Sequence, residues 1–149
     1  MTQLKRTTSA DPDFQNLAAL LDKELATRDG NEHDFYSQFN KIDALKNVVV
    51  YFIEDTAIAC GAFKPYNDKT IEIKRMFVQP AFRGKRIAVD ILNELEQWAT
   101  QLNYTACILE TGKKQPEAIA LYQRSGYAVM PNYGQYAGIE NSVCMKKAL

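Results

Sequence analysis

Residues 76–88, MFVQPAFRGKRIA, lead from an apolar strand through a short loop into a long helix. The first turn of a helix has backbone N–H groups without partners, and the helix dipole favours negative charge there. Arg83, Lys85 and Arg86 add positive charge at this turn, and Gly84 leaves the backbone open to close approach. The stretch therefore predicts an anion site, for which phosphate is the usual guest.

Two other phosphate-binding loops do not fit this stretch. A P-loop requires glycine at position 79 and serine or threonine at position 86, where the chain has Gln79 and Arg86. A dinucleotide-binding turn requires three glycines, and this stretch offers Gly84 alone. The alternative that stays open is a solvated basic turn at the start of a structural helix, because charge clusters commonly need no ligand.

Hydrophobic periodicity on both sides of the stretch predicts a mixed α/β sheet. Apolar runs or period-two alternation indicate strands, and apolar residues at helical spacing indicate helices. The strands between residues 48 and 78 are expected to form an antiparallel meander, within one domain that covers residues 1–149. The expected strands are 3–8, 48–53, 57–64, 70–78, 105–110, 127–130 and 142–146. One expected helix begins at Asp11-Pro12, and the others cover 32–39, 85–102 and 116–126.

Charge and cysteine usage exclude several classes of function. The 18 basic residues balance 18 acidic ones, so nucleic acid and anionic membranes are not expected as main partners. The N-terminus has no signal-like apolar region, and no apolar run is long enough to cross a bilayer. Cys60, Cys107 and Cys144 are far apart, and His33 is the single histidine, so we expect no metal site. Reduced, buried cysteines are typical of a cytoplasmic protein.

Two motifs together make the sequence similar to the GNAT family of N-acetyltransferases. The family's motif Arg/Gln-x-x-Gly-x-Gly/Ala, after a strand that ends in Val-x-Pro, resembles Arg83-Gly84-Lys85-Arg86-Ile87-Ala88 after Val78-Gln79-Pro80. A second signature, Ala-Ile-x-Leu-Tyr-x-x-x-Gly-Tyr/Phe, resembles residues 118–127. The chain departs from the family at Arg86, where the family has glycine, and at Gln115, where the family often has asparagine.

The resemblance implies a GNAT-like acyl-CoA N-acyltransferase fold, with a mostly antiparallel sheet flanked by helices and acetyl-CoA as co-substrate. By resemblance, the pantetheine arm would pair with the backbone beside the expected strand end, and the pyrophosphate would lie on the loop amides. The thioester would lie between this strand and the strand at 108–110. The cofactor-binding residues implied are Met76, Phe77, Val78, Arg83, Gly84, Lys85, Arg86, Ile87, Ala88 and Gln115.

Transfer to an amine requires a neutral amine, a donor for the oxyanion and a proton for the thiolate. By resemblance, Tyr122 is the candidate acid for the thiolate, and its alternative role is packing. Glu72 is the candidate base, acting directly or through a water, with an exposed strand glutamate as the alternative and Glu110 as the rival base. Residues 72, 74 and 76 are expected on one face of a strand, and an N–H near Phe77 or Val78 is the expected oxyanion donor.

The acceptor is expected to be a primary amine of a small molecule, bound by aromatic segments 29–40 and 132–140. An amine of a protein, either an N-terminus or a lysine, is the alternative acceptor. A non-catalytic acyl-CoA-binding module is the alternative from another class, because Arg86 stands in the phosphate loop. A homodimer is expected from architecture, because the last strands expose an edge that a partner could cover.

Overall fold

The computed structural model describes residues 1–29 and 45–149 of the chain. The helix expected at 32–39 and most of the expected acceptor segment 29–40 lie outside the described residues. The strands are β1 (Thr2–Thr7), β2 (Asn47–Ile53), β3 (Thr56–Pro65), β4 (Thr70–Val78), β5 (Ala106–Gly112), β6 (Ala128–Met130) and β7 (Ser142–Ala148), and the helices are α1 (Pro12–Asp29), α3 (Ile87–Gln101) and α4 (Pro116–Arg124), with short 3-10 turns η2 (Pro80–Phe82) and η3 (Gly134–Tyr136).

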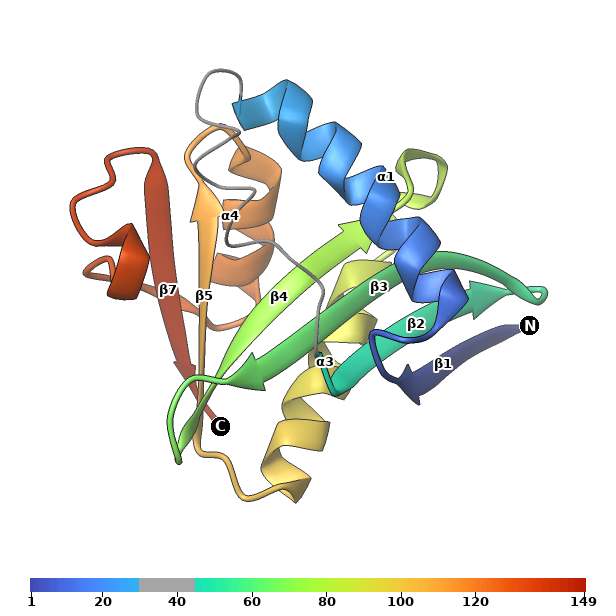
Figure 1. Cartoon of the computed structure of the whole chain (residues 1–149), viewed down its shortest axis with the longest axis horizontal. Coiled ribbons are helices and arrows are strands. Elements are labelled where there is room, and N and C mark those ends of the chain that lie inside the picture. The colour runs from blue at the N-terminus through green and yellow to red at the C-terminus, as the bar shows by residue number, and fades with distance from the viewer. Residues whose placement is uncertain (30–44) are drawn as a thin grey trace.

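The described strands form one seven-stranded sheet in the order β1-β2-β3-β4-β5-β7-β6. The pair β4 and β5 is parallel, and the other neighbouring pairs are antiparallel. Helix α1 crosses one face of the sheet and α3 lies behind it, as Figure 1 shows. The mixed, mostly antiparallel α/β sheet expected from the sequence is therefore confirmed. None of the helices within residues 1–29 and 45–149 has the length and hydropathy that a bilayer crossing needs.

Helix α1 begins where the sequence predicts, because Asp11 caps its first turn. The amides of Asp13 and Phe14 donate hydrogen bonds to Asp11 Oδ1 at 2.8 and 3.4 Å. The apolar stripe of α1 packs on β2, β3 and β4 in one core, with Phe14 and Leu17 fully buried. This packing fixes α1 over β4, the strand that leads into the predicted anion site.

Helix α3 covers the opposite face of the sheet with the stripe predicted from its sequence. Its buried residues are Ile87, Ile91, Leu92, Leu95 and Ala99. They pack against β2, β3 and β4 in a second core. Burying one such aliphatic side chain stabilises the fold by about 1.5–3 kcal/mol, so this core anchors the start of α3 beside the end of β4.

The neighbouring strands β4 and β5 separate near the middle of the sheet. Their parallel ladder runs from Thr70 opposite Ala106 to Glu72 opposite Ile108 and then ends. Strand β4 continues to Val78, while β5 continues along β7 to Gly112. Figure 1 shows the two strands diverging from this point. The sheet therefore opens at the carboxyl end of β4, next to the anion-binding stretch.

A β-bulge at Arg75 corrects one expectation about β4. The pairing of β3 with β4 shifts between Cys60 and Ala62, and Arg75 has a left-handed φ of 59°. Residues 72 and 74 therefore share a face, but Met76 turns to the opposite face and packs with the α3 core. The expectation that residue 76 lies on the same face as 72 and 74 is wrong, because the extra residue reverses the alternation.

Gly61 is the residue of β3 that makes room for this reversal. A Cβ atom added there would lie 2.5 Å from Met76 Sδ and 2.8 Å from Ile91 Cγ2. No real Cβ tolerates such distances, so glycine lets Met76 and α3 approach the strand. The bulge at Arg75 and the glycine at position 61 thus act together to place Met76 against α3.

Candidate active site

The loop between η2 and α3 presents an open backbone. Gly84 has φ +82°, and a Cβ atom added there would meet nothing within 4 Å. Arg86 is the N-cap of α3 and has a left-handed φ of 64°. Because this conformation favours glycine, the backbone itself explains why glycine would suit position 86. The helix expected from residue 85 begins at Ile87 for the same reason.

A cavity of about 380 Å³, the cofactor groove, runs along this loop and the end of β4. It is closed on one side by α1 and on the other by α4. The groove brings together nine of the residues implied by the resemblance, Met76, Phe77, Val78, Arg83, Gly84, Arg86, Ile87, Ala88 and Gln115. Lys85 does not line it: its ammonium lies 5.8 Å from the Phe82 ring centroid.

Arg83 already has partners inside the cofactor groove. Its Nε donates to the Val78 carbonyl at 2.8 Å, and its Nη2 contacts both carboxylate oxygens of Glu24 at 2.9 and 3.1 Å. Glu24 belongs to α1 and also lines the groove. The Arg83 guanidinium is therefore paired with a carboxylate at the place where a phosphate is expected. The local motif alone does not reveal this pairing.

The ladder of β3 and β4 decides which backbone groups face the gap. The Gln79 amide donates to the Ile58 carbonyl at 3.0 Å, so this residue pair is a hydrogen-bonded one. Alternation then directs the backbone groups of Phe77 toward β3 and those of Val78 away from it. The sequence named Phe77 and Val78 as candidate oxyanion donors. The Phe77 N–H points toward β3 and is therefore excluded as a donor in the gap between β4 and β5, whereas the Val78 N–H faces that gap.

Tyr122 lies on α4 where the cofactor groove meets a second cavity. Its side chain is 6% exposed, and its ring packs edge-on against Tyr127 with centroids 5.8 Å apart. Burial, helped by the Glu110 carboxylate, raises the pKa of Tyr122 above its ordinary value. The phenol therefore keeps its proton at neutral pH and remains a proton donor.

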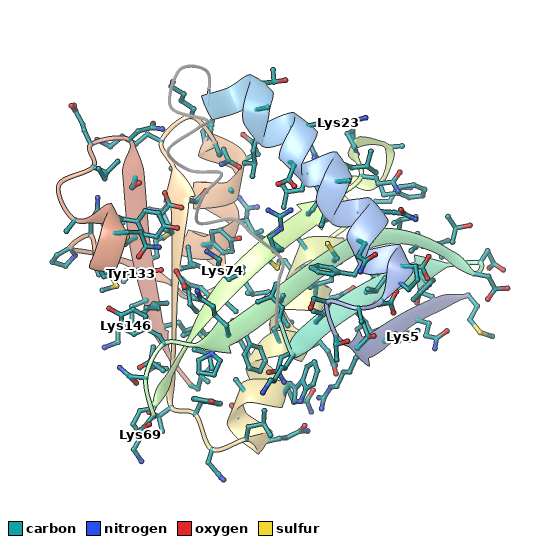
Figure 2. All side chains as sticks on the ribbon, viewed as in Figure 1. Lys5, Lys23, Lys69, Lys74, Tyr133 and Lys146 are labelled. Atoms are coloured by element: carbon teal, nitrogen blue, oxygen red, sulfur yellow. The ribbon has the colours of Figure 1, made fainter. Side chains whose placement is uncertain are left out.

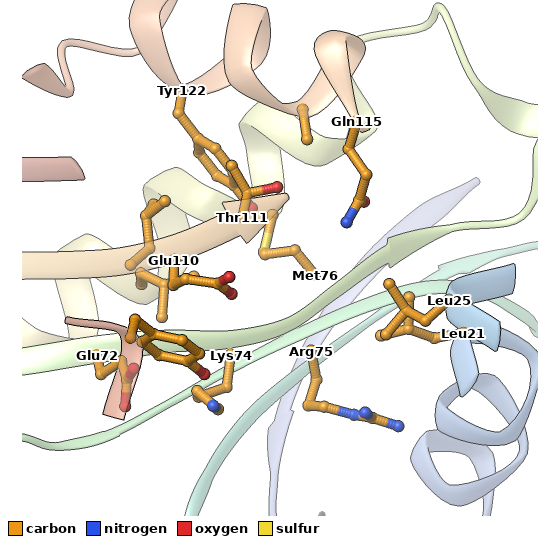
Figure 3. A pocket seen from close by; sticks show the side chains of 14 residues that line it. Leu21, Leu25, Glu72, Lys74, Arg75, Met76, Glu110, Thr111, Gln115 and Tyr122 are labelled. Carbon is orange, nitrogen blue, oxygen red and sulfur yellow. The ribbon is translucent and has the colours of Figure 1, made fainter. Parts of the chain in front are cut away.

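The second cavity, the inner pocket, has a volume of about 110 Å³ and lies between β4 and β5. In Figure 3 the Glu110 carboxylate points into it, while the Arg75 guanidinium points toward α1. There Arg75 donates to the Ala18 carbonyl and pairs with Asp22, both at 2.9 Å. Residues that line both cavities are Leu21, Met76, Gln115, Ala118 and Tyr122.

Glu72 lies in the inner pocket and is only 3% exposed. The alternative of an exposed strand glutamate is therefore wrong. The Tyr133 hydroxyl donates to Glu72 Oε2 at 2.6 Å, and the Lys64 ammonium lies 4.0 Å from Oε1. Tyr133 comes from the segment before β7 and reaches the side of the sheet that carries Lys74 (Figure 2). No local sequence pattern could have paired residues so far apart.

Lys74 is a charged residue of the inner pocket that the sequence analysis did not single out. It is 9% exposed and stands two positions after Glu72 on the same face of β4. Burial lowers the pKa of Lys74, although the carboxylates of Glu72 and Glu110 act in the opposite direction. Charges of both signs therefore meet in the pocket, on the side away from the cofactor groove.

Within residues 1–29 and 45–149, no three His, Cys, Asp or Glu side chains gather in a way that could hold a metal ion. The three cysteines are free and buried. Burial raises the pKa of Cys60 and that of Cys107 to about 12, so neither thiol is an activated nucleophile. Cys60 and Cys107 are therefore not candidates for proton transfer.

Comparison with known proteins gives a consistent result. The chain is 38% identical over 95 residues to the IAA acetyltransferase of Azospirillum brasilense, an alignment that covers 63% of this chain and 62% of that protein. The chain thus spans less than two thirds of that relative. A crystal structure from Klebsiella pneumoniae, named as an acyl-CoA N-acyltransferase, superposes with a TM-score of 0.82 at 27% identity and covers 100% of this chain and 98% of its own.

The PaiA N-acetyltransferase of Thermoplasma acidophilum, solved with coenzyme A, has the same fold. Its TM-score is 0.75 at 14% identity, and the match covers 100% of this chain and 99% of that one. Residues 14–127 of the chain match the Acetyltransferase (GNAT) family, a range that holds both the loop at Gly84 and Tyr122. The chain therefore belongs to the acetyltransferase (GNAT) family.

Proposed function

We propose that the chain transfers an acetyl group from acetyl-CoA to the primary amine of a small molecule, as one N-acetyltransferase domain over residues 1–149 in the cytoplasm. One observation carries the proposal: the cofactor groove and the inner pocket meet at Met76 and Tyr122, where β4 and β5 separate. Two reactants bound in these cavities would meet there, and proximity of this kind can supply about 7–11 kcal/mol.

The cofactor groove fits the phosphates and the pantetheine arm by its chemistry. The open backbone at Gly84 and the start of α3 suit a pyrophosphate, and Arg83 and Arg86 supply positive charge. The gap-facing backbone of Val78 suits an amide of the arm, as when a peptide adds to a sheet edge. Acetyl-CoA supplies the activated acetyl thioester, and no metal is invoked.

Glu72 is the proposed base of the inner pocket. It stands four residues before Met76, about 13 Å along an ideal strand, so water carries the proton from the amine to the carboxylate. Glu110, whose carboxylate points into the same pocket (Figure 3), attracts the incoming ammonium and is the rival base. The gap-facing N–H of Val78 holds the carbonyl oxygen as charge develops on it.

Tyr122 is the proposed acid. Its phenol borders both cavities and keeps its proton at neutral pH. A phenol is a weaker acid than a thiol, so it donates as the thiolate departs rather than before. General acid help of this kind contributes about 10²–10⁴-fold.

The size of the inner pocket favours a small acceptor over a protein amine. A volume of about 110 Å³ holds a few non-hydrogen atoms next to the reacting carbon. An extended peptide would need an open groove on this side. A homodimer through the short edge strand β6, where Val129 is 63% exposed, is part of the proposal. Nucleic acid and membranes are not proposed as partners.

The test is release of free thiol from acetyl-CoA in the presence of small primary amines and of peptides with free N-termini or lysines. The proposal predicts amine-dependent release with at least one small amine and little with the peptides. Release with peptides alone would favour the protein acceptor. Binding of acetyl-CoA by calorimetry without release over a broad panel would favour the non-catalytic acyl-CoA-binding module. Absence of binding would contradict both.

A further inference from the structure

We infer that Tyr133 is a positioning residue that holds the carboxylate of Glu72 through a hydrogen bond to Oε2, so that Oε1 is left to take up the proton. This inference rests on the proposed role of Glu72 as the base. The bond is 2.6 Å long, which is the length of a charge-assisted bond from a hydroxyl to a carboxylate. Tyr133 is 9% exposed and Glu72 is 3% exposed, so water competes little for either group.

The two oxygens of Glu72 have different surroundings. Among the described residues, Tyr133 is the one hydrogen-bond donor to this carboxylate, and it contacts Oε2. Within residues 1–29 and 45–149, the cation that pairs with Oε1 is Lys64 at 4.0 Å, which is beyond hydrogen-bond distance and half exposed. Oε1 can therefore accept a hydrogen bond from a water or an amine in the inner pocket while Oε2 stays fixed.

The ring of Tyr133 is itself held from two sides. Tyr66 packs edge-on against it with centroids 5.3 Å apart, and Tyr136 does so at 5.8 Å. Burial, together with the Glu72 carboxylate, raises the pKa of Tyr133 far above its ordinary value. The hydroxyl therefore stays protonated at any working pH and always donates. Both the position and the protonation state of this donor are therefore fixed. A tyrosine that only packed against its neighbours would need neither.

Other titratable groups of the described residues surround Glu72 from several elements. They differ in sign, so none of them alone sets the pH response. A hydrogen bond to the charged form of a carboxylate favours that form, and its loss disfavours it. The groups are Lys64 of β3, Lys74 and Arg75 of β4, Glu110 of β5, Tyr136 of η3 and Cys144 of β7.

The experiment compares Tyr133→Phe with native protein by the pH profile of kcat/KM with acetyl-CoA and a good amine. Loss of the donor is expected to move the acidic limb up by about one pH unit, and thus to lower kcat/KM about tenfold on that limb. The affinity for acetyl-CoA, measured by calorimetry, is expected to stay native. Thermal unfolding of the variant shows that the fold is retained.

Tyr127→Phe is the matched control. Tyr127 also donates a hydrogen bond to a glutamate, Glu96 Oε2 at 2.9 Å, in a partly buried position on the far side of the sheet. Both variants remove one hydroxyl and keep the ring, so they are expected to lose comparable stability. A positioning role predicts a shifted acidic limb for Tyr133→Phe and a native limb for Tyr127→Phe. Equal profiles for the two variants would overturn the inference.

A double-mutant cycle separates this inference from the proposed function. In the Glu72→Gln background, Tyr133→Phe is expected to have no further effect on kcat, because the base that it positions is absent. An undiminished effect in that background would overturn the positioning role and leave Glu72 as the base. Native turnover of Glu72→Gln itself would contradict the proposed base, and with it the inference.

Discussion

The cofactor groove and the inner pocket share Met76 and Tyr122 but are built in different ways. The groove takes its anion-binding part from one continuous stretch, residues 76–88, and much of what it offers is backbone. The inner pocket collects side chains from separate elements, Glu72 of β4, Glu110 of β5 and Tyr136 of η3. If the proposed function holds, cofactor binding depends on local conformation and proton transfer depends on long-range packing, so the two should respond to different mutations.

Tyr122→Phe should give the largest effect and separate the two cavities most clearly. The ring keeps its packing on Tyr127, so the fold and the cofactor groove stay intact. Loss of the proton donor is expected to lower kcat about 10²–10⁴-fold, with the Kd for acetyl-CoA nearly unchanged. Tyr104→Phe, a ring that packs on Phe63 away from both cavities, is the control. Native turnover of Tyr122→Phe would make Tyr122 a packing residue.

Gly84→Ala should do the reverse and weaken cofactor binding. The added methyl group covers the backbone at the anion site, so the affinity for acetyl-CoA is expected to fall about tenfold by calorimetry. Gly138→Ala is the matched control, because Gly138 also has a left-handed φ, +78°, and open space around its Cβ position. Both variants carry the same strain. If both weakened acetyl-CoA binding equally, the loop would not be the anion site.

Glu24→Gln tests whether a carboxylate competes with phosphate for Arg83. Its removal frees the guanidinium, so the affinity for acetyl-CoA is expected to rise about threefold, most clearly at low salt. Glu94→Gln is the control: Glu94 forms a 2.7 Å ion pair with Arg6, and the exposures of the two pairs are nearly equal, 33% and 23% against 36% and 27%. Weaker binding by Glu24→Gln would instead mean that Glu24 orients Arg83 for the phosphate.

Arg86→Gly should have the smallest effect and shows how this chain differs from its family. Glycine accepts the left-handed φ of 64° without strain, so the free energy of unfolding is expected to rise by about 0.5 kcal/mol in urea unfolding. Loss of the charge is expected to weaken acetyl-CoA binding about threefold. Tighter binding by this variant would show that the arginine side chain crowds the site.

The groove is easier to predict from the sequence than the pocket, for a physical reason. The loop around Gly84 and the start of α3 follow from strand, turn and helix signals that lie side by side in the chain. The bulge at Arg75 has no such signal, since its arginine adopts a conformation that glycine usually marks. Contacts across the fold, Tyr133 with Glu72 and Glu24 with Arg83, need the packed sheet and α1 before they exist.

Hydrogen exchange of the backbone amides with and without saturating coenzyme A shows whether the loop before α3 is the anion site. The amides of residues 84–88 are expected to exchange more slowly on binding, because the ligand accepts their hydrogen bonds. The amide of Val78 should be protected as well, while β1 and the distant end of α3 should not change. Binding of coenzyme A without slower exchange at residues 84–88 would show that the phosphates lie elsewhere.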